Sequence, residues 1–166
     1  NAPANDAIER LVRGKFSQAS YHLEPVPGLD FARNHALAVA TQEVVCFIDD
    51  DVVLAPGALG KLVDVFHKFP RAAACTGRVF ALTQDTEGAR LFEANGGFER
   101  GSRRVRLPGD ATRALHGLPA PLIAWAFSIG AGSCLAVRRS AALALRGFDE
   151  ALDLGRVLPG GGDHDM

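Results

Sequence analysis

Three adjacent carboxylates, Asp49, Asp50 and Asp51, directly follow the apolar run 44–48 (VVCFI). Two carboxylates about 4 Å apart repel each other by roughly 4 kcal/mol at an effective dielectric constant near 20. A hard divalent cation removes this repulsion, because Mg²⁺ and Mn²⁺ prefer carboxylate oxygens and complete their shell with water and substrate phosphates. The triplet therefore indicates a site for Mg²⁺ or Mn²⁺, and the alternative is a solvated acidic turn.

Two further carboxylates, Asp163 and Asp165, lie in the Gly-rich stretch 158–166 (LPGGGDHDM). Two kinds of enzyme use a D-x-D pair such as Asp49 and Asp51. In a sugar-nucleotide transferase, the pair holds a metal that bridges the donor diphosphate, and a distant acid takes the proton of the acceptor hydroxyl. In a haloacid-dehalogenase-type phosphatase, the first aspartate is the nucleophile.

The phosphatase interpretation has partial support. Its first motif, an apolar strand that ends in D-x-D-x-[TV], fits Asp49, Asp51 and Val53, and Thr76 and the final acidic pair fit later positions. The lysines of the chain are Lys15, Lys61 and Lys68. All of them precede Thr76, so the later cation that this chemistry needs for the phosphoryl group is missing unless an arginine replaces it.

The elements that position these acids are expected to alternate along the first half of the chain. We expect helices over 7–13, 31–40 and 56–69, and strands over 20–24, 43–48 and 72–82. Asp30 is the candidate N-cap of the second helix. A later strand over 133–138 and a helix over 140–145, stopped by Gly147, follow an irregular middle. The alternation favours an α/β fold with a mostly parallel sheet, in which ligands bind at the carboxyl ends of the strands.

Composition sets the class of protein. The chain has 166 residues, 48% of them hydrophobic and 22% charged, which is enough for one globular domain with a core. The net charge of −1 does not indicate nucleic acid or an anionic membrane as a partner. The cysteines, Cys46, Cys75 and Cys134, lie in apolar runs without metal-binding spacing. We interpret them as buried free thiols in a reducing compartment.

Two segments in the second half of the chain each allow two interpretations. Residues 118–137 carry no charge and are about long enough to span a bilayer, but prolines and glycines interrupt them. We therefore expect a buried loop followed by a strand. The basic cluster of Arg100, Arg103, Arg104 and Arg106 is a solvated face or, alternatively, a contact for an anionic acceptor or lipid headgroup.

Several segments, taken in order, resemble the family 2 glycosyltransferases of the GT-A fold. The matching segments are NAPANDAIERLV, GLDFARNHALAVA, VVCFIDDDVVLAPGAL, FHKFPRAAACTGRV, SIGAGSCLAVRRSAALALRGFDEAL and LPGGGDHDM. They cover nearly all of the chain except the stretch from about 83 to 120. The resemblance implies a Rossmann-like α/β fold with a mostly parallel sheet flanked by helices. It also implies a metal-dependent inverting transfer of a sugar from a nucleoside-diphosphate sugar to an acceptor hydroxyl.

The resemblance implies roles for the acids. Asp49 and Asp51 hold the Mg²⁺ or Mn²⁺ ion, with Asp51 the better candidate for direct contact, and Asp50 holds the ribose or completes the metal shell. Asp163 is the catalytic base. Many members of the family carry Glu before this Asp, where this chain has Gly162, and Asp165 is a candidate to replace part of that function. A helix-capping aspartate is the alternative for Asp163.

The resemblance also implies roles for other side chains. Arg33 and Asn34 match a position beside the donor nucleotide; the alternative for Arg33 is a surface helix residue, and the alternative for Asn34 is a local cap or pairing. Gly130 and Gly132 let the backbone approach the donor phosphates, or form a bulge before the strand. Trp125 lines the acceptor site or, alternatively, belongs to the core.

The expected partners are a nucleoside-diphosphate sugar donor and a saccharide or lipid-linked acceptor, without nucleic acid. We expect a cytoplasmic location, with peripheral membrane association of the full-length protein at the cytoplasmic face. The family places a strand, a helix and a strand before residue 1, and further elements after Asp163. We therefore expect residues 1–166 to form a single partial domain, inactive or weakly active alone.

Within this partial domain we expect a donor- and metal-binding portion over 1–82 and an acceptor-side portion with the catalytic loop over 83–166. A non-catalytic sugar-nucleotide-binding domain is the remaining alternative, because the chain lacks the family's first elements and the acid at position 162.

Overall fold

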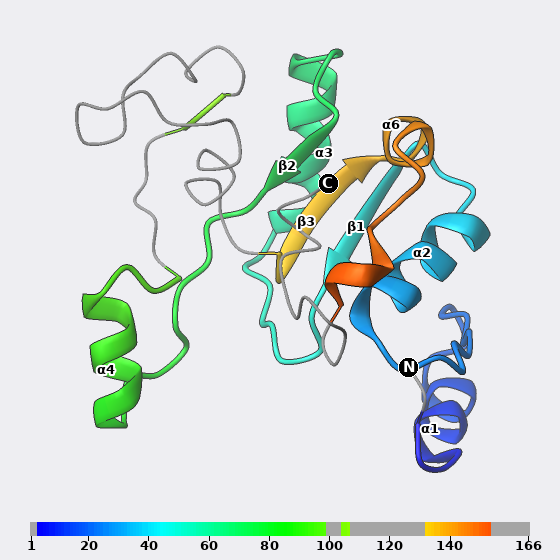
Figure 1. The fold of residues 1–166 in the computed structure, drawn as a ribbon, viewed down its shortest axis with the longest axis horizontal. Coiled ribbons are helices and arrows are strands. Elements are labelled where there is room, and N and C mark those ends of the chain that lie inside the picture. Colours follow the sequence, from blue (N-terminus) through cyan, green and yellow to red (C-terminus); the bar gives the residue numbers. More distant parts are fainter. Residues whose placement is uncertain (1–2, 99–103, 107–131, 154–166) are drawn as a thin grey trace. The chain divides into compact units, whose positions relative to one another are not determined.

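The computed structural model describes residues 3–98, 104–106 and 132–153 of the protein (Figure 1). The chain divides into two compact units, one made of residues 1–42 and 142–166 and the other of residues 43–141. The division at residue 82 into donor-side and acceptor-side portions concerns function, and it stays a prediction.

The sheet of the 43–141 unit has the strand order β1-β3-β2, with β1 at Val44–Ile48, β2 at Ala74–Thr76 and β3 at Cys134–Arg138 (Figure 1). Both β1 and β2 pair antiparallel with β3, and Cys46 and Cys75 lie on either side of Ala136. The expected mostly parallel sheet is therefore wrong for the described strands. β1 and β2 do run in the same direction, but β3 lies between them, so no two hydrogen-bonded neighbours are parallel.

Helix α3 (Ala58–Lys68) connects β1 to β2 and covers the sheet. It begins after Gly57, which has a φ of 75°, and Pro70 lies just beyond its last turn, where a helix cannot continue. Leu62 and Phe66 lie one helical turn apart and pack with Cys134 and Ala136 of β3 in one buried cluster. The helix predicted over 56–69 is confirmed, two residues shorter at its start and one at its end.

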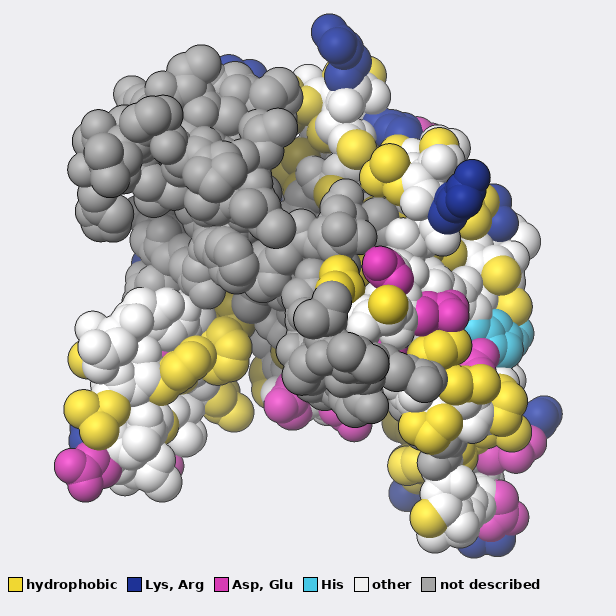
Figure 2. Space-filling view, viewed as in Figure 1, with side chains coloured by type: hydrophobic (Ala, Val, Ile, Leu, Met, Phe, Trp, Pro, Cys, Tyr) yellow, Lys and Arg dark blue, Asp and Glu magenta, His cyan; other side chains and the backbone are white. Residues whose placement is uncertain are grey.

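Two expectations about the rest of the chain are wrong. Residues 20–24 do not form a strand, and the strand predicted over 72–82 is only three residues long. A helix, α4 (Glu87–Ala94), forms in the stretch expected to be irregular, and Thr86 caps it by accepting a hydrogen bond from the Ala89 amide at 3.1 Å. Figure 2 shows apolar side chains on the surface of α4, and Leu91 and Phe92 are more than half exposed.

The other unit contains α1 (Ala7–Lys15), α2 (Leu29–Val39) and the 3-10 turn η1 (Glu150–Leu152), which packs against α2. Helix α6 (Arg139–Ala144) follows β3 directly. Arg146 and Gly147 then adopt positive φ angles of 70° and 80°, and the Gly147 amide donates to the Ala142 carbonyl at 2.9 Å. The predicted helix stop at Gly147 is confirmed, because this left-handed conformation is the usual way to satisfy the last carbonyls of a helix.

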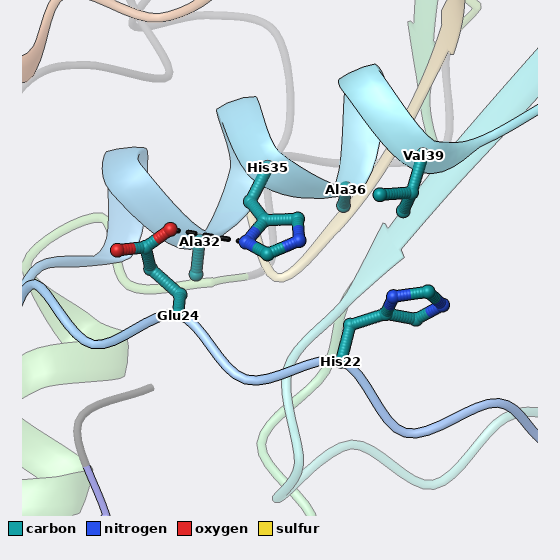
Figure 3. Close-up of a pocket in the computed structure, with 6 residues that line it drawn as sticks. All are labelled: His22, Glu24, Ala32, His35, Ala36 and Val39. Atoms are coloured by element: carbon teal, nitrogen blue, oxygen red, sulfur yellow. Dashed lines mark hydrogen bonds and ion pairs between the residues drawn. The ribbon is translucent and has the colours of Figure 1, made fainter.

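A pocket of about 160 Å³ lies on α2 (Figure 3). Its lining residues are His22, Glu24, Ala32, His35, Ala36 and Val39. One Glu24 oxygen accepts from the Val26 amide at 2.8 Å, and the other lies 3.0 Å from His35 Nδ1. These two hydrogen bonds lower the pKa of Glu24, and the bond from the Val26 amide has the larger effect.

Most of the uncharged segment 118–137 lies outside the described residues. In the part of the chain that the structure describes, we find no helix with the length and apolar character that a bilayer crossing requires.

All three thiols are free; the predicted burial is confirmed for Cys134, whereas Cys46 and Cys75 are only half-buried. Burial, and to a smaller extent the neighbouring thiols, raises the pKa of Cys46 and of Cys75 to about 11. Because only the thiolate reacts, we expect iodoacetamide to label both residues at pH 8 about 10²-fold more slowly in the native protein than in urea. Mass spectrometry of each cysteine against pH measures this, with N-acetylcysteine as control. A native labelling midpoint near pH 8.5 would contradict it.

The Glu24 hydrogen bonds generate a pH prediction. A carboxyl whose pKa is lower in the folded state stabilises the fold above its unfolded pKa, and this stabilisation disappears as the pH falls through the folded value. We therefore expect Glu24→Gln to lower the melting temperature at pH 7 and to lower it by a smaller amount at pH 3.5. Asp64→Asn, the removal of a carboxylate at an exposed position of α3, is the control. An equal loss for Glu24→Gln at both pH values would count against the Glu24 contacts.

Candidate metal and donor site

The acidic turn, by which we mean Asp49, Asp50 and Asp51, begins where β1 ends. Ile48 pairs with Cys134, and the next amide, that of Asp49, donates to the Ser133 carbonyl at 3.2 Å. The Asp49 carbonyl then accepts from the Val52 amide at 3.2 Å, which closes a turn. The backbone of the acidic turn is thus tied to β3 at its first residue.

The carboxylates of the acidic turn are left open for a ligand. Asp50 and Asp51 are exposed and Asp49 is half-buried. None of the three carboxylates makes a hydrogen bond or ion pair with another described residue. Three acids at the end of a strand, with their oxygens unused within the described chain, can accept a cation or a hydrogen-bond donor from solution.

Gly132 and Ser133 lie beside the acidic turn because the antiparallel register continues one residue past Ile48 and Cys134. The Ser133 hydroxyl is buried and has no hydrogen-bond partner among the described residues. An unpaired buried hydroxyl costs about 1–3 kcal/mol, so such a group calls for a polar partner such as water or a ligand oxygen. Gly132, predicted from the sequence to contact the donor, is therefore next to both the acidic turn and an unsatisfied hydroxyl.

The predicted Mg²⁺ or Mn²⁺ site at the acidic turn stays a prediction. Within residues 3–98, 104–106 and 132–153, no three or more His, Cys, Asp or Glu side chains are grouped to hold a metal ion. Asp49, Asp50 and Asp51 are among those residues, so the acidic turn does not form a ready three-carboxylate metal cage. Mg²⁺ is commonly bound by one or two carboxylates with water and substrate phosphates, rather than by a complete protein cage.

The sheet order bears on the phosphatase interpretation. That chemistry needs the Thr76 hydroxyl close to a phosphoryl group on Asp49. Thr76 ends β2, and β3 separates β2 from β1. Two strand spacings amount to about 10 Å, which is too far for one phosphoryl group to contact both side chains directly. The described strands therefore do not support the phosphatase.

Arg33 and Asn34 lie in α2 and are engaged within their own unit. Arg33 is 5% exposed, its Nη1 lies 3.2 Å from Asp30 Oδ1, and its guanidinium lies 5.1 Å from the centre of the Phe148 ring. The alternative of a surface helix residue is wrong for Arg33. Asn34 bonds both backbone groups of Phe148 and the Glu150 carboxylate. A donor contact by Arg33 or Asn34 stays a prediction.

Four predicted site residues lie outside the described residues: Asp163, Asp165, Trp125 and Gly130. The predicted catalytic base and acceptor contacts are among them, so the structure brings together only the metal-side residues and Gly132. Of the basic cluster, Arg104 and Arg106 are described; both are exposed, and the Arg106 guanidinium lies 5.3 Å from the centre of the Phe69 ring.

Sequence reasoning missed Asp153 and Glu150 as partners of α2. The segment 147–150 (GFDE) contains Glu150 but not Asp153, and its sequence does not show which residues its acids contact. Sequence separation hid those partners, since α2 lies more than 100 residues earlier.

The chain was compared with families, with curated proteins and with solved structures. A family model described as Glycosyl transferase family 2 matches residues 6–144, a range that runs from the start of α1 through the acidic turn to the end of α6. Neither the curated proteins nor the solved structures gave a significant match. Because the family model covers well over half of the sequence, including β1, β3 and the acidic turn between α2 and α3, the chain belongs to glycosyl transferase family 2.

Proposed function

We propose that this chain carries the donor and metal site of an inverting glycosyltransferase that depends on Mg²⁺ or Mn²⁺. Family membership supports glycosyltransferase activity, implies a GT-A fold and indicates a nucleotide-sugar donor and an acceptor. The observation that carries the finer proposal is the acidic turn, which has open carboxylates and is hydrogen-bonded through Asp49 to Ser133, a residue with an unsatisfied hydroxyl.

In this proposal Asp49 and Asp51 hold the divalent cation, and Asp50 contacts the donor ribose or completes the metal shell. When bound, the cation offsets the charge of the donor diphosphate and of the departing nucleoside diphosphate. The Ser133 hydroxyl and the backbone of Gly132 are next to the acidic turn, where a phosphate oxygen would find a donor and room for close approach.

The transfer step is a single displacement at the anomeric carbon. Asp163 accepts the proton of the acceptor hydroxyl while the hydroxyl oxygen forms a bond to the anomeric carbon. The bond between that carbon and the diphosphate oxygen breaks, and its electron pair leaves with the nucleoside diphosphate. Attack from the face opposite the leaving group inverts the configuration of the sugar.

The remaining predicted residues complete the donor and acceptor sides. Arg33, Asn34 and Gly130 belong to the donor side, and Trp125 and Asp165 to the acceptor side, where an aromatic ring suits the apolar face of a sugar. The acceptor is a saccharide or a lipid-linked saccharide. A cytoplasmic protein associated peripherally with the membrane fits a lipid-linked acceptor.

Removal of the preferred metal ligand tests the site. We expect Asp51→Asn to weaken the binding of UDP or GDP in the presence of Mn²⁺ by more than about tenfold, because a direct ligand matters more than an outer-shell partner. Isothermal calorimetry measures this, and Asp64→Asn, an equal charge change on α3, is the matched control. Equal nucleotide affinity in wild type and Asp51→Asn would refute a metal site at the acidic turn.

Removal of the base separates catalysis from binding. In the protein as the cell makes it, we expect Asp163→Asn to lower kcat by about 10²–10⁴-fold and to leave Mn²⁺-dependent nucleotide binding unchanged. A transfer assay with several sugar nucleotides measures kcat, and calorimetry measures binding. Nucleotide binding without turnover in the wild type would instead indicate a non-catalytic binding domain. Phosphate release from monoesters would indicate the phosphatase.

A further inference from the structure

Helix α2 begins without a capping side chain of its own. Its N-cap residue is Gly28, and the expected cap, Asp30, is already inside the helix. The carboxylate of Asp153 takes this role instead, since its two oxygens accept from the Leu29 and Asp30 amides, each at 2.9 Å. Asp153 is only 2% exposed. A buried carboxylate at a helix N-terminus is stabilised by these charge-assisted bonds and by the helix dipole.

Asn34 makes the reverse connection, from α2 to the segment that contains Asp153. Its Oδ1 accepts from the Phe148 amide at 2.8 Å, and its Nδ2 donates to the Phe148 carbonyl at 3.0 Å and to Glu150 Oε1 at 2.9 Å. Only this orientation of the side-chain amide works, because the opposite one would place N–H against N–H and oxygen against two acceptors. We call the contacts of Asn34 and Asp153 together the reciprocal clamp.

Two glycines make room for the reciprocal clamp. A Cβ atom on Gly28 would collide with Asp153 Oδ2, and a Cβ atom on Gly147 would collide with Asn34 Oδ1. Both glycines also have positive φ, 145° and 80°, which side chains disfavour. Gly28 thus lies against the Asp153 side chain, and Gly147 lies against the Asn34 side chain.

We propose that Asn34 is a positioning residue, which holds residues 147–153 on α2 together with Asp153 and so anchors the chain ten residues before Asp163. Three of the four hydrogen-bond positions of the Asn34 amide are taken by the clamp. The importance of Asn34 to the reaction therefore comes from the segment that it holds, whereas the sequence predicts a direct donor contact. The kinetic part of this inference rests on the proposed function.

The first test does not depend on activity. We expect Asn34→Ala to speed amide hydrogen exchange at Phe148 by about tenfold or more, and also at Leu29 and Asp30, because the two halves of the clamp hold one segment. Asp153→Asn should give the same pattern. Asn95→Ala is the control, since the Asn95 side chain donates to the Leu91 carbonyl of α4 and to no other group among the described residues. Faster exchange at Phe148 alone, with Leu29 and Asp30 unchanged, would refute a reciprocal clamp.

The second test separates positioning from donor binding by steady-state kinetics of the protein as the cell makes it. We expect Asn34→Ala to lower kcat by about 10–100-fold with the donor KM within about twofold of the wild type, because a misplaced catalytic group slows the chemical step. A raised donor KM with unchanged kcat would show a donor contact, and unchanged kcat and KM per folded molecule would show a purely structural role. Either result would overturn the inference.

A compensating pair sharpens this second test. Asn34→Asp places a carboxylate against the Phe148 carbonyl and Glu150, so we expect a loss of kcat at least as large as for Asn34→Ala. Adding Glu150→Gln supplies an N–H donor toward the introduced carboxylate, and we expect it to restore part of kcat. No restoration would count against the clamp. A wild type without transferase activity would refute the proposed function, and the amide-exchange test would still decide the reciprocal clamp.

Discussion

The site depends on β3, the strand that bonds to β1 on one edge and β2 on the other. Its central residues, Ala136 and Val137, are 1% exposed, and Leu135 is nearly as buried. Burial of a Val or Leu side chain contributes about 1.5–3 kcal/mol, whereas the single bond from Asp49 to Ser133 contributes about 1 kcal/mol. The packing of β3 therefore contributes most to holding the start of the acidic turn in place. The hydrogen bond from Asp49 to Ser133 contributes less.

The exposure of the acidic turn explains why the chain tolerates three adjacent aspartates. Repulsion between two carboxylates about 4 Å apart is roughly 4 kcal/mol near a protein surface but only about 1 kcal/mol in water. Asp50 and Asp51 are exposed, so their repulsion lies toward the lower value. The fold can thus hold three adjacent aspartates whose carboxylates have no partner among the described residues.

The order of the elements followed from the sequence, but their pairing did not. Apolar runs and helical spacing predicted α1, α2, α3, β1 and β3 to within about two residues. The direction of pairing was mispredicted because β3, which lies between β1 and β2, begins 58 residues after the end of β2, and composition does not reveal such a partner. β2 is short for a related reason. Its partner β3 begins at Cys134, and the Gly77 amide makes the last bond to it.

The candidate site, like the fold, could be predicted only in part. The acidic turn follows directly from the end of an apolar strand, so its position was correct once β1 was correct. Gly132 was predicted from the resemblance, and its position next to the turn follows from the antiparallel register, which the sequence did not reveal. The cap of α2 was assigned to Asp30, the nearest acid, since sequence reasoning favours local partners. The actual cap, Asp153, lies 123 residues away from Asp30.

Burial and hydrogen bonding separate the two kinds of aspartate in this chain, although their sequence contexts look alike. Asp30 and Asp153 are buried; Asp30 pairs with Arg33, and both oxygens of Asp153 accept backbone amides. Removing either would leave a buried partner unpaired, a structural cost that does not require a ligand. The carboxylates of the acidic turn have no such partner among the described residues, so nothing in the described fold needs three of them there. A bound cation would give these three carboxylates the partner that the described fold does not, which is why the metal site is proposed here and not at Asp30 or Asp153.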